Sequence, residues 1–261
     1  MSEADLSAVK LACDAIEDQG FAVLENVLPA EQAERLVQLV KTAPNQVPGH
    51  KGWDAYVALL NHDVAFADLV GHPLTLAIVR HLLGGRAEAA PNAFAWDEHD
   101  QIHLMNCDAL VAHPGSESGY WHLDPPMGQL NPNRPVPDFP LSVNVMWLLT
   151  DYNKKNGATR VLPRSHLKRQ VPPPTRDPLE GEVFLTAPAG SVAIVPNTIW
   201  HVASPNRTDR NRVAVACCYV PWWINRLTPD CYPITEEVYR RLPEPVQAMT
   251  KFQLDWNMDF R

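Results

Sequence analysis

The sequence predicts a mainly β fold with flanking helices, built around a jelly-roll core. Strand-like runs are short and are separated by turns rich in proline and glycine, and the chain carries 25 prolines in 261 residues. Strands and helices do not alternate in a regular way, which argues against a doubly wound α/β fold. We therefore expect one domain over 1–261, with a helical part at about 1–90, the jelly-roll core at about 91–225 and a C-terminal helical extension.

The helical N-terminal part rests on apolar residues that recur at helical spacing. The predicted helices are 6–19, which Gly20 stops; a helix that begins at Pro29, with the core face Ala33, Leu36, Val37 and Val40; and a helix from His72-Pro73 to Gly84-Gly85. A strand is predicted at 21–24. Residues 43–62, rich in Pro, Gly, Asn and His, predict a loop followed by a short helix.

The core part contains apolar runs of strand length. They are 102–112, 141–150, 182–186, 191–195 and 212–220. In the second run the odd-numbered residues form one apolar face. Proline-dense stretches at 131–140 and 171–178 are incompatible with central strands and predict extended loops. A helix at 235–242 is expected to close the domain.

Composition narrows the class of protein. The chain is 46% hydrophobic and 20% charged, as in ordinary globular proteins, and its formal net charge of -8 argues against binding nucleic acid. No apolar run approaches the ~18 residues that a membrane span needs, and the N-terminus lacks a signal-peptide pattern. Five cysteines without CxxC or zinc-type spacing fit a reducing compartment. We expect a cytoplasmic protein without a membrane partner; the oligomeric state is not predicted.

The candidate chemistry begins at His122-Leu123-Asp124. In an extended strand the side chains of residues i and i+2 leave the same face, so His122 and Asp124 can hold one metal ion together. His201, far downstream, would complete a 2-His-1-carboxylate triad of the kind that leaves open positions on Fe(II). For the tripeptide alone, a partly exposed strand with two polar residues is the commoner explanation.

The sequence after His201 strengthens the site hypothesis. Arg212 opens the apolar run 212–220, behind a polar turn at 206–209. A guanidinium at the start of that strand can form a bidentate pair with a carboxylate held near the metal. A single arginine at a strand end more often points to water, so the hypothesis depends on all four residues together.

These residues resemble the phytanoyl-CoA dioxygenase family of Fe(II)/2-oxoglutarate-dependent oxygenases. The likeness covers most of the chain. It rests on His122-Leu123-Asp124, Asn156-Gly157-Ala158-Thr159, Pro163-Arg164-Ser165-His166, Trp200-His201 with Asn206 and Arg212, the early 18–24 segment, and 72–84. It implies a double-stranded β-helix (jelly-roll, cupin-like) core. It also implies iron bound by His122, Asp124 and His201, with Arg212 and Thr159 contacting 2-oxoglutarate.

The chain departs from the family pattern at three positions. Arg164 stands where glycine usually precedes Ser-His, Ser191 stands where aspartate is common, and Ala203 stands where a small hydroxyl residue is frequent. None of these is a metal position. Asn106, an amide in an apolar strand, is either a cosubstrate contact or a structural residue that needs hydrogen-bond partners. Four tryptophans are either lining of an apolar substrate cavity or ordinary core residues: Trp121, Trp200, Trp222 and Trp223.

The resemblance implies oxidation of an aliphatic C–H bond of a small molecule, with O2 as second cosubstrate and release of succinate and CO2. Related halogenases replace the carboxylate ligand by a small residue, so Asp124 favours hydroxylation over halogenation; desaturation, ring closure and epimerisation stay open. Two alternatives come from other classes. A zinc hydrolase can use the same three ligands but gives Arg212 no role, and a non-catalytic jelly-roll binding module needs no triad. The sequence does not identify the substrate, and natural-product and amino-acid metabolism both stay open as its setting.

Overall fold

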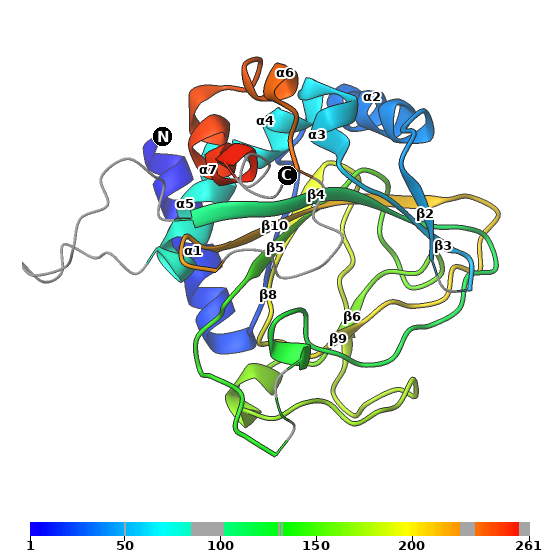
Figure 1. The fold of residues 1–261 in the computed structure, drawn as a ribbon. Helices are drawn as coiled ribbons and strands as arrows, with labels where there is room; N and C mark the ends of the chain where they lie inside the picture. Colours follow the sequence, from blue (N-terminus) through cyan, green and yellow to red (C-terminus); the bar gives the residue numbers. More distant parts are fainter. Residues whose placement is uncertain (50, 85–101, 130, 132, 225–232, 256–261) are drawn as a thin grey trace, which may run out of the picture.

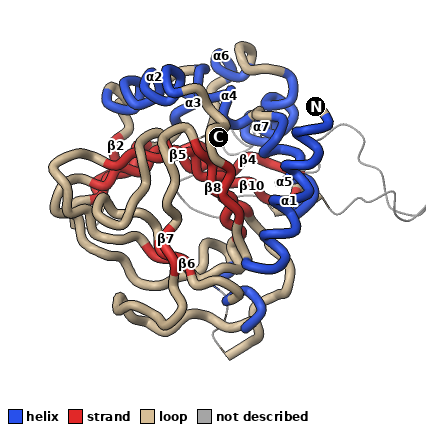
Figure 2. The backbone as a smooth tube through the Cα atoms, turned by 180° about the vertical axis from the view of Figure 1, so that it is seen from behind, coloured by secondary structure: helices blue, strands red, loops and turns tan. Residues whose placement is uncertain are grey.

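The computed structural model describes the chain except for residues 50, 85–101, 130, 132, 225–232 and 256–261. Its described part is built on two antiparallel sheets, with helices on the outer side of the larger one (Figures 1 and 2). The three-stranded sheet lies on the opposite side of the larger sheet from most of the helices (Figure 1). One face of the large sheet therefore packs against the helices, and its other face is turned toward the small sheet (Figure 1).

The large sheet has seven strands. Their order is β1 (Ala22–Leu24), β8 (Ser191–Pro196), β5 (Val143–Leu148), β10 (Arg212–Pro221), β4 (Ile102–Ala112), β3 (Trp53–Tyr56) and β2 (Gln46–Pro48). The small sheet has the order β7 (Val183–Phe184), β6 (Arg160–Val161) and β9 (His201–Val202). Strands that are remote in sequence are therefore neighbours. For example, β4 pairs with β10, which places residues from both halves of the chain side by side.

Side-chain alternation along β10 separates the two faces of the large sheet. Val213 and Val215 pack into the cluster beneath the helices, whereas Ala214 packs between the sheets with Val161 of β6. Arg212, two residues from Ala214, therefore shares the inward face. On β5 the predicted alternation is also present, because the odd-numbered residues face the helices and the even-numbered residues face inward.

The helices cover the outer face of the large sheet. They are α1 (Glu3–Gln19), α2 (Ala30–Lys41), α3 (Leu59–His62), α4 (Ala67–Val70), α5 (Pro73–Leu83), α6 (Glu236–Tyr239) and α7 (Glu244–Asp255), with a 3-10 turn at Val64–Phe66. Two further 3-10 turns, Met127–Gln129 and Ser165–Lys168, lie on the side of the small sheet (Figure 1). The predicted stop of the first helix is confirmed, since Gly20 has a φ of 92° and its N–H donates to Ile16 O. Within the described residues, no helix combines the length and the hydropathy of a membrane span.

Two local predictions were wrong. The segment 43–62, expected to be a loop before its short helix, contributes β2 and β3 to the edge of the large sheet. These strands exist because Trp53 pairs with Ala112 of β4, a remote partner that local composition does not reveal. The closing helix expected at 235–242 is only α6, and a longer helix, α7, follows it.

The backbone of Arg164 lies in a region that glycine adopts more easily than other residues. Its φ of 62° and ψ of 9° lie in the left-handed region, which costs a residue with a Cβ atom about 1 kcal/mol relative to glycine. The side chain pairs with Asp18 on the surface, where both groups are more than half exposed. An ion pair this exposed adds little stability.

We therefore expect Arg164→Gly to be more stable than Arg164→Ala by about 1 kcal/mol in the free energy of unfolding. Both substitutions remove the ion pair with Asp18, so their difference isolates the strain of the left-handed backbone. Urea-induced unfolding of the two variants checks this expectation. An alanine variant at least as stable as the glycine variant would show that the backbone at Arg164 carries no strain.

Candidate metal and cosubstrate site

Three predicted ligands converge where an extended segment that contains His122 and Asp124 meets β9. His122 forms an antiparallel bridge with His201 of β9, in which each backbone N–H donates to the other's carbonyl oxygen at 3.0 and 3.1 Å. Asp124 Oδ1 lies 3.7 Å from His122 Nε2 and 3.5 Å from His201 Nε2. All three ligand atoms lie within 4.8 Å of one another, and in the described part of the chain no other group of three His, Cys, Asp or Glu side chains does this.

Backbone carbonyls orient both imidazole rings. His122 Nδ1 lies 2.9 Å from Tyr120 O, and His201 Nδ1 lies 3.1 Å from Ile199 O. Because a carbonyl oxygen only accepts, each Nδ1 carries the proton and each Nε2 keeps its lone pair for a metal ion. Two such nitrogens with one carboxylate oxygen fit the 2-His-1-carboxylate donor set that non-haem Fe(II) uses.

Asn144 of β5 orients the carboxylate of Asp124. Its Nδ2 donates to Asp124 Oδ2 at 2.5 Å, which leaves Oδ1 facing the two histidines. This contact was not predicted from the sequence. The available signal was an amide on the inward face of an apolar strand, where a buried polar group requires a partner.

The charges of the cluster favour an ionised carboxylate. Burial opposes ionisation of Asp124, but His201 and His122 outweigh burial, so the pKa of Asp124 lies well below its ordinary value. Burial likewise disfavours protonation of His201, yet the carboxylate of Asp124 raises its pKa above the ordinary value. Burial and the neighbouring His201 lower the pKa of His122. The side chain of His122 is 47% exposed against 10% for His201, so the cluster opens on the His122 side.

Asn144→Ala is expected to weaken metal binding by roughly 10- to 100-fold, because groups that orient metal ligands typically contribute this much. Calorimetric titration with Mn(II) measures it. Tyr219→Phe is the control, since it also removes one buried hydrogen bond, from the Tyr219 hydroxyl to Val70 O, on the helix-facing side of β10. Equal metal affinity of Asn144→Ala and the wild-type chain would remove Asn144 from the site.

Metal affinity is also expected to depend on pH through His201. Below the raised pKa of this residue a bound metal must displace one proton, so the apparent Kd should rise about tenfold for each pH unit of acidification. Above that pKa the Kd should be constant. His122 should add a second proton only at lower pH, because its pKa is lowered. Titrations between about pH 5 and 8 check the slope, and a Kd that is flat over this range would contradict it.

Arg212 is buried at the start of β10, with only 1% of its surface exposed. Its guanidinium lies between the rings of Trp53 and Tyr152, 4.4 and 4.5 Å from their centroids. Nη1 donates to the Tyr152 hydroxyl, and Nη2 donates to Gly157 O at 3.1 Å. Among the described residues no carboxylate pairs with it, and burial lowers its pKa. A buried cation without a counter-ion is costly, so the arrangement favours an anionic ligand.

The surroundings of Arg212 include residues to which the sequence gave no role. Tyr152 was not singled out, Trp53 lay within the predicted segment 43–62 without a contact assigned to Arg212, and Gly157 appeared only as part of a motif. Gly157 has a φ of 89°, and a Cβ atom there would lie 2.8 Å from Ser204 O. Glycine at this position therefore allows the chain to pass close to Ser204 while its own carbonyl accepts from Arg212.

The two other predicted cosubstrate contacts also have defined places. Thr159 is buried beside β6, two residues after Gly157, and its backbone oxygen accepts from Leu185 N. Asn106 of β4 faces Cys218 of β10, which in turn faces Asn144 of β5. Within the described part of the chain, nothing donates to the buried Oδ1 of Asn106. The roles of Thr159 and Asn106 toward 2-oxoglutarate stay predictions.

Two of the four tryptophans pack away from the metal ligands. Trp121 and Trp200 are buried in a cluster with Leu123 and Leu162, on the face opposite to His122 and Asp124. Trp121 and Trp200 are therefore core residues and do not line the cluster of metal ligands. Trp222 and Trp223, which follow β10, are 42% and 57% exposed.

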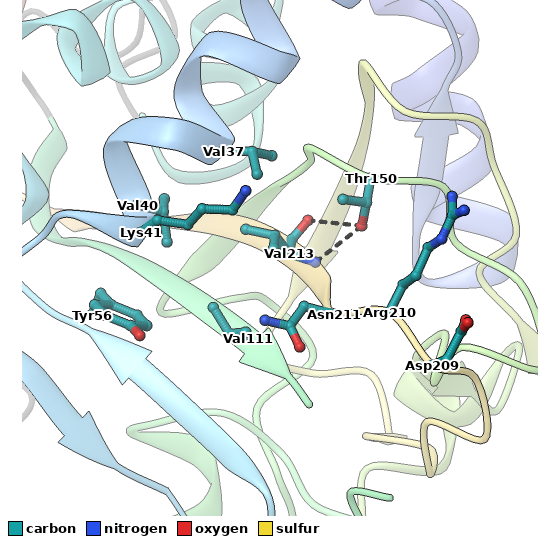
Figure 3. A pocket seen from close by; sticks show the side chains of 10 residues that line it. All are labelled: Val37, Val40, Lys41, Tyr56, Val111, Thr150, Asp209, Arg210, Asn211 and Val213. Atoms are coloured by element: carbon teal, nitrogen blue, oxygen red, sulfur yellow. Dashed lines mark hydrogen bonds between the residues drawn. The ribbon is translucent and has the colours of Figure 1, made fainter. Parts of the chain in front are cut away.

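A cavity of about 370 Å³ lies on the helix-facing side of the large sheet, away from the space between the two sheets (Figure 3). Its lining residues are Val37, Val40, Lys41, Tyr56, Val111, Thr150, Asp209, Arg210, Asn211 and Val213. Val111 and Val213 belong to the cluster beneath the helices, so this cavity is separate from the three metal ligands. The Thr150 hydroxyl accepts from Val213 N at 3.0 Å, which fixes the strand directly after Arg212 (Figure 3).

Comparisons with known proteins identify the family of this chain. The family model of phytanoyl-CoA dioxygenase (PhyH) matches residues 16–214. Dioxygenase af480 of Aspergillus fumigatus is 28% identical over 195 residues, which are 74% of this chain and 54% of that protein, so the chain spans about half of its length. Dioxygenase trt7 of Aspergillus terreus is 24% identical over 264 residues, covering 95% of this chain and 84% of that protein.

Solved structures share the fold. The epimerase SnoN, crystallised with Fe3+, alpha ketoglutarate and nogalamycin RO, has a TM-score of 0.61 at 16% identity, covering 89% of this chain and 98% of SnoN. HygX from Streptomyces hygroscopicus, with nickel and 2-oxoglutarate bound, has a TM-score of 0.61 at 15% identity, covering 88% of this chain and 94% of HygX. The predicted jelly-roll class is thereby confirmed. The chain belongs to the phytanoyl-CoA dioxygenase family, and it shares the fold of the solved structures that hold a metal ion with alpha ketoglutarate or 2-oxoglutarate.

Proposed function

We propose that this protein hydroxylates an aliphatic C–H bond of a small molecule and converts 2-oxoglutarate to succinate and CO2. One oxygen atom of O2 enters the product and the other enters succinate. The observation that carries the proposal is the pairing of two features on one scaffold. One is the cluster of His122, Asp124 and His201; the other is the buried Arg212, for which no carboxylate partner exists in the described residues.

In this proposal each residue has a stated role. The two Nε2 atoms and Asp124 Oδ1 hold Fe(II), and Asn144 keeps the carboxylate turned toward it. Arg212 binds the distal carboxylate of 2-oxoglutarate, with the Tyr152 hydroxyl beside it. Thr159 and Asn106 supply further contacts. The bound iron supplies the activation of O2, and the protein contributes position and a charge of the correct sign.

Asp124 bears on the type of reaction. Its carboxylate occupies the ligand position that a halide would need, which supports hydroxylation over halogenation. Two solved proteins of the same fold are named as an epimerase and a carbocyclase. Because the fold alone does not select among these outcomes, product analysis of the same assay distinguishes hydroxylation from epimerisation, desaturation or ring closure.

The proposed substrate is a discrete natural product. This rests on the named ligands of proteins with the same fold, since SnoN was crystallised with nogalamycin RO and HygX with hygromycin B. Neither compound is assigned to this protein. The open His122 side of the ligand cluster is the route by which such a molecule would reach the iron.

The function is tested by measuring succinate formed from 2-oxoglutarate with Fe(II), ascorbate, O2 and a panel of natural products. We expect turnover that requires both iron and O2 and that rises with the correct substrate. Activity with zinc alone, without 2-oxoglutarate, would support a hydrolase instead. A binding module would be supported by two results together: the wild-type chain forms no succinate, and the His122→Ala variant binds the small molecule as tightly as the wild type does.

A further inference from the structure

A buried ion pair lies beside the metal-ligand cluster without belonging to it. Arg160 of β6 and Glu182 have side chains that are only 6% and 13% exposed. Arg160 Nη1 donates to both carboxylate oxygens of Glu182, at 3.2 and 3.1 Å. Glu182 Oε2 also accepts from Leu179 N at 2.9 Å. Burying two charges is expensive, so a pair with this geometry calls for an explanation beyond stability.

The second guanidinium nitrogen of Arg160 links two further segments. Nη2 donates to Ser118 Oγ and to Arg176 O, each at 3.0 Å. The guanidinium also lies 5.4 Å from the ring centroid of Trp121. Ser118 Oγ in turn donates to Ala203 O at 2.9 Å. One planar side chain therefore joins the segment that leads into His122, the loop that contains Arg176, and Glu182.

These segments carry the two histidines. Trp121 precedes His122, and its backbone and indole N–H groups donate to Thr175 O and Asp177 O, in the loop that Arg160 holds at Arg176. On the other side, β6 pairs with β9, so that Val161 lies opposite His201. Ala203, which Ser118 contacts, follows His201 by two residues. The contacts of Arg160 thus reach both the segment that contains His122 and the surroundings of β9, which contains His201.

We propose that Arg160, fixed by Glu182, is a positioning residue that sets the spacing of His122 and His201. This rests on the proposed function, because it assumes that the two histidines bind a metal. The planar guanidinium donates in two directions at once, to a carboxylate and to the Ser118–Arg176 side. A lysine can keep the charge near Glu182 but cannot make both sets of contacts.

The test is calorimetric titration of the full chain with Mn(II) for the wild type and three variants. We expect Arg160→Lys to bind Mn(II) about tenfold more weakly and Ser118→Ala to bind a few-fold more weakly. Val79→Ala is the matched control, because it removes buried apolar volume in α5 and lowers stability without touching the site. It should bind Mn(II) with unchanged affinity.

Each outcome has a separate meaning. A wild-type affinity that neither Arg160→Lys nor Ser118→Ala reduces overturns the positioning role while leaving the metal site intact. A loss in Val79→Ala as large as that in Arg160→Lys also overturns it, since lower stability alone would then explain the effect. Absence of Mn(II) binding by the wild type would overturn the proposed function together with this inference. If Arg160→Lys does not fold, Ser118→Ala decides, because it leaves the ion pair in place.

Discussion

Arg212→Lys is expected to weaken the binding of 2-oxoglutarate by about 100-fold or more while leaving metal affinity unchanged. The substitution keeps a positive charge but loses the planar group that lies between Trp53 and Tyr152, and with it the second donor. A hydrogen bond to a charged group contributes about 1.5–3 kcal/mol, and each 1.4 kcal/mol corresponds to about tenfold in affinity, so losing one such bond together with the ring contacts gives about 100-fold. Titration of the Mn(II)-loaded protein with 2-oxoglutarate, without O2, measures the change.

A graded control accompanies this substitution. Tyr152→Phe removes only the hydroxyl that accepts from Arg212, so it should weaken 2-oxoglutarate binding by about tenfold, as expected for one hydrogen bond to a charged group. The affinity for 2-oxoglutarate should therefore decrease from the wild type to Tyr152→Phe and further to Arg212→Lys. If Arg212→Lys bound 2-oxoglutarate within about twofold of the wild type, Arg212 would not be the anchor of the distal carboxylate.

Asp124→Ala is expected to abolish detectable metal-dependent succinate formation and to weaken Mn(II) binding by on the order of 100- to 1,000-fold. Metal sites in proteins bind with roughly 10 kcal/mol or more, shared among a few ligands, so one ligand accounts for a few kcal/mol. Asp124 also supplies the only negative charge of the three ligands. Calorimetry gives the metal affinity, and succinate formation in a single assay gives the activity.

His113→Ala is a suitable control for that loss. His113 Nε2 and Asp54 Oδ2 form another histidine–carboxylate pair, 2.6 Å apart. Among the described residues this pair does not belong to a group of three possible metal ligands. Its removal should leave Mn(II) affinity unchanged. If His113→Ala weakened Mn(II) binding as much as Asp124→Ala, metal loss would reflect general destabilisation, and the three-ligand cluster would lose its special status.

Local sequence patterns were sufficient for most of the regular structure. Helical spacing predicted α1, α2 and α5, and runs of apolar residues predicted β4, β5 and β10. The stop at Gly20 followed from the left-handed conformation that glycine accepts. Patterns of this kind are reliable where an element buries one face, because its own periodicity records which residues are buried. They failed for β2 and β3, whose strand state depends on pairing with β4.

The same division applies to the site. His122 and Asp124 project together because extended backbone alternates its side chains, which is a local property of three consecutive residues. His201 and Arg212 were candidates from the sequence pattern, and the resemblance to a family supplied their roles toward iron and 2-oxoglutarate. Nothing in the sequence alone assigned Asn144 to the carboxylate of Asp124, or Trp53 and Tyr152 to the two faces of the Arg212 guanidinium.

The sequence by itself thus determined most of the secondary elements, the two faces of β5 and the adjacency of one histidine and one carboxylate. Only the tertiary structure decided that His201 pairs with His122, that Asn144 reaches Asp124, and that Arg160 joins the two segments that contain these histidines. The physical reason is the range of the forces involved. Backbone periodicity is set by neighbours along the chain, whereas hydrogen bonds between remote strands depend on which sheet edges meet, and that depends on how the whole core packs.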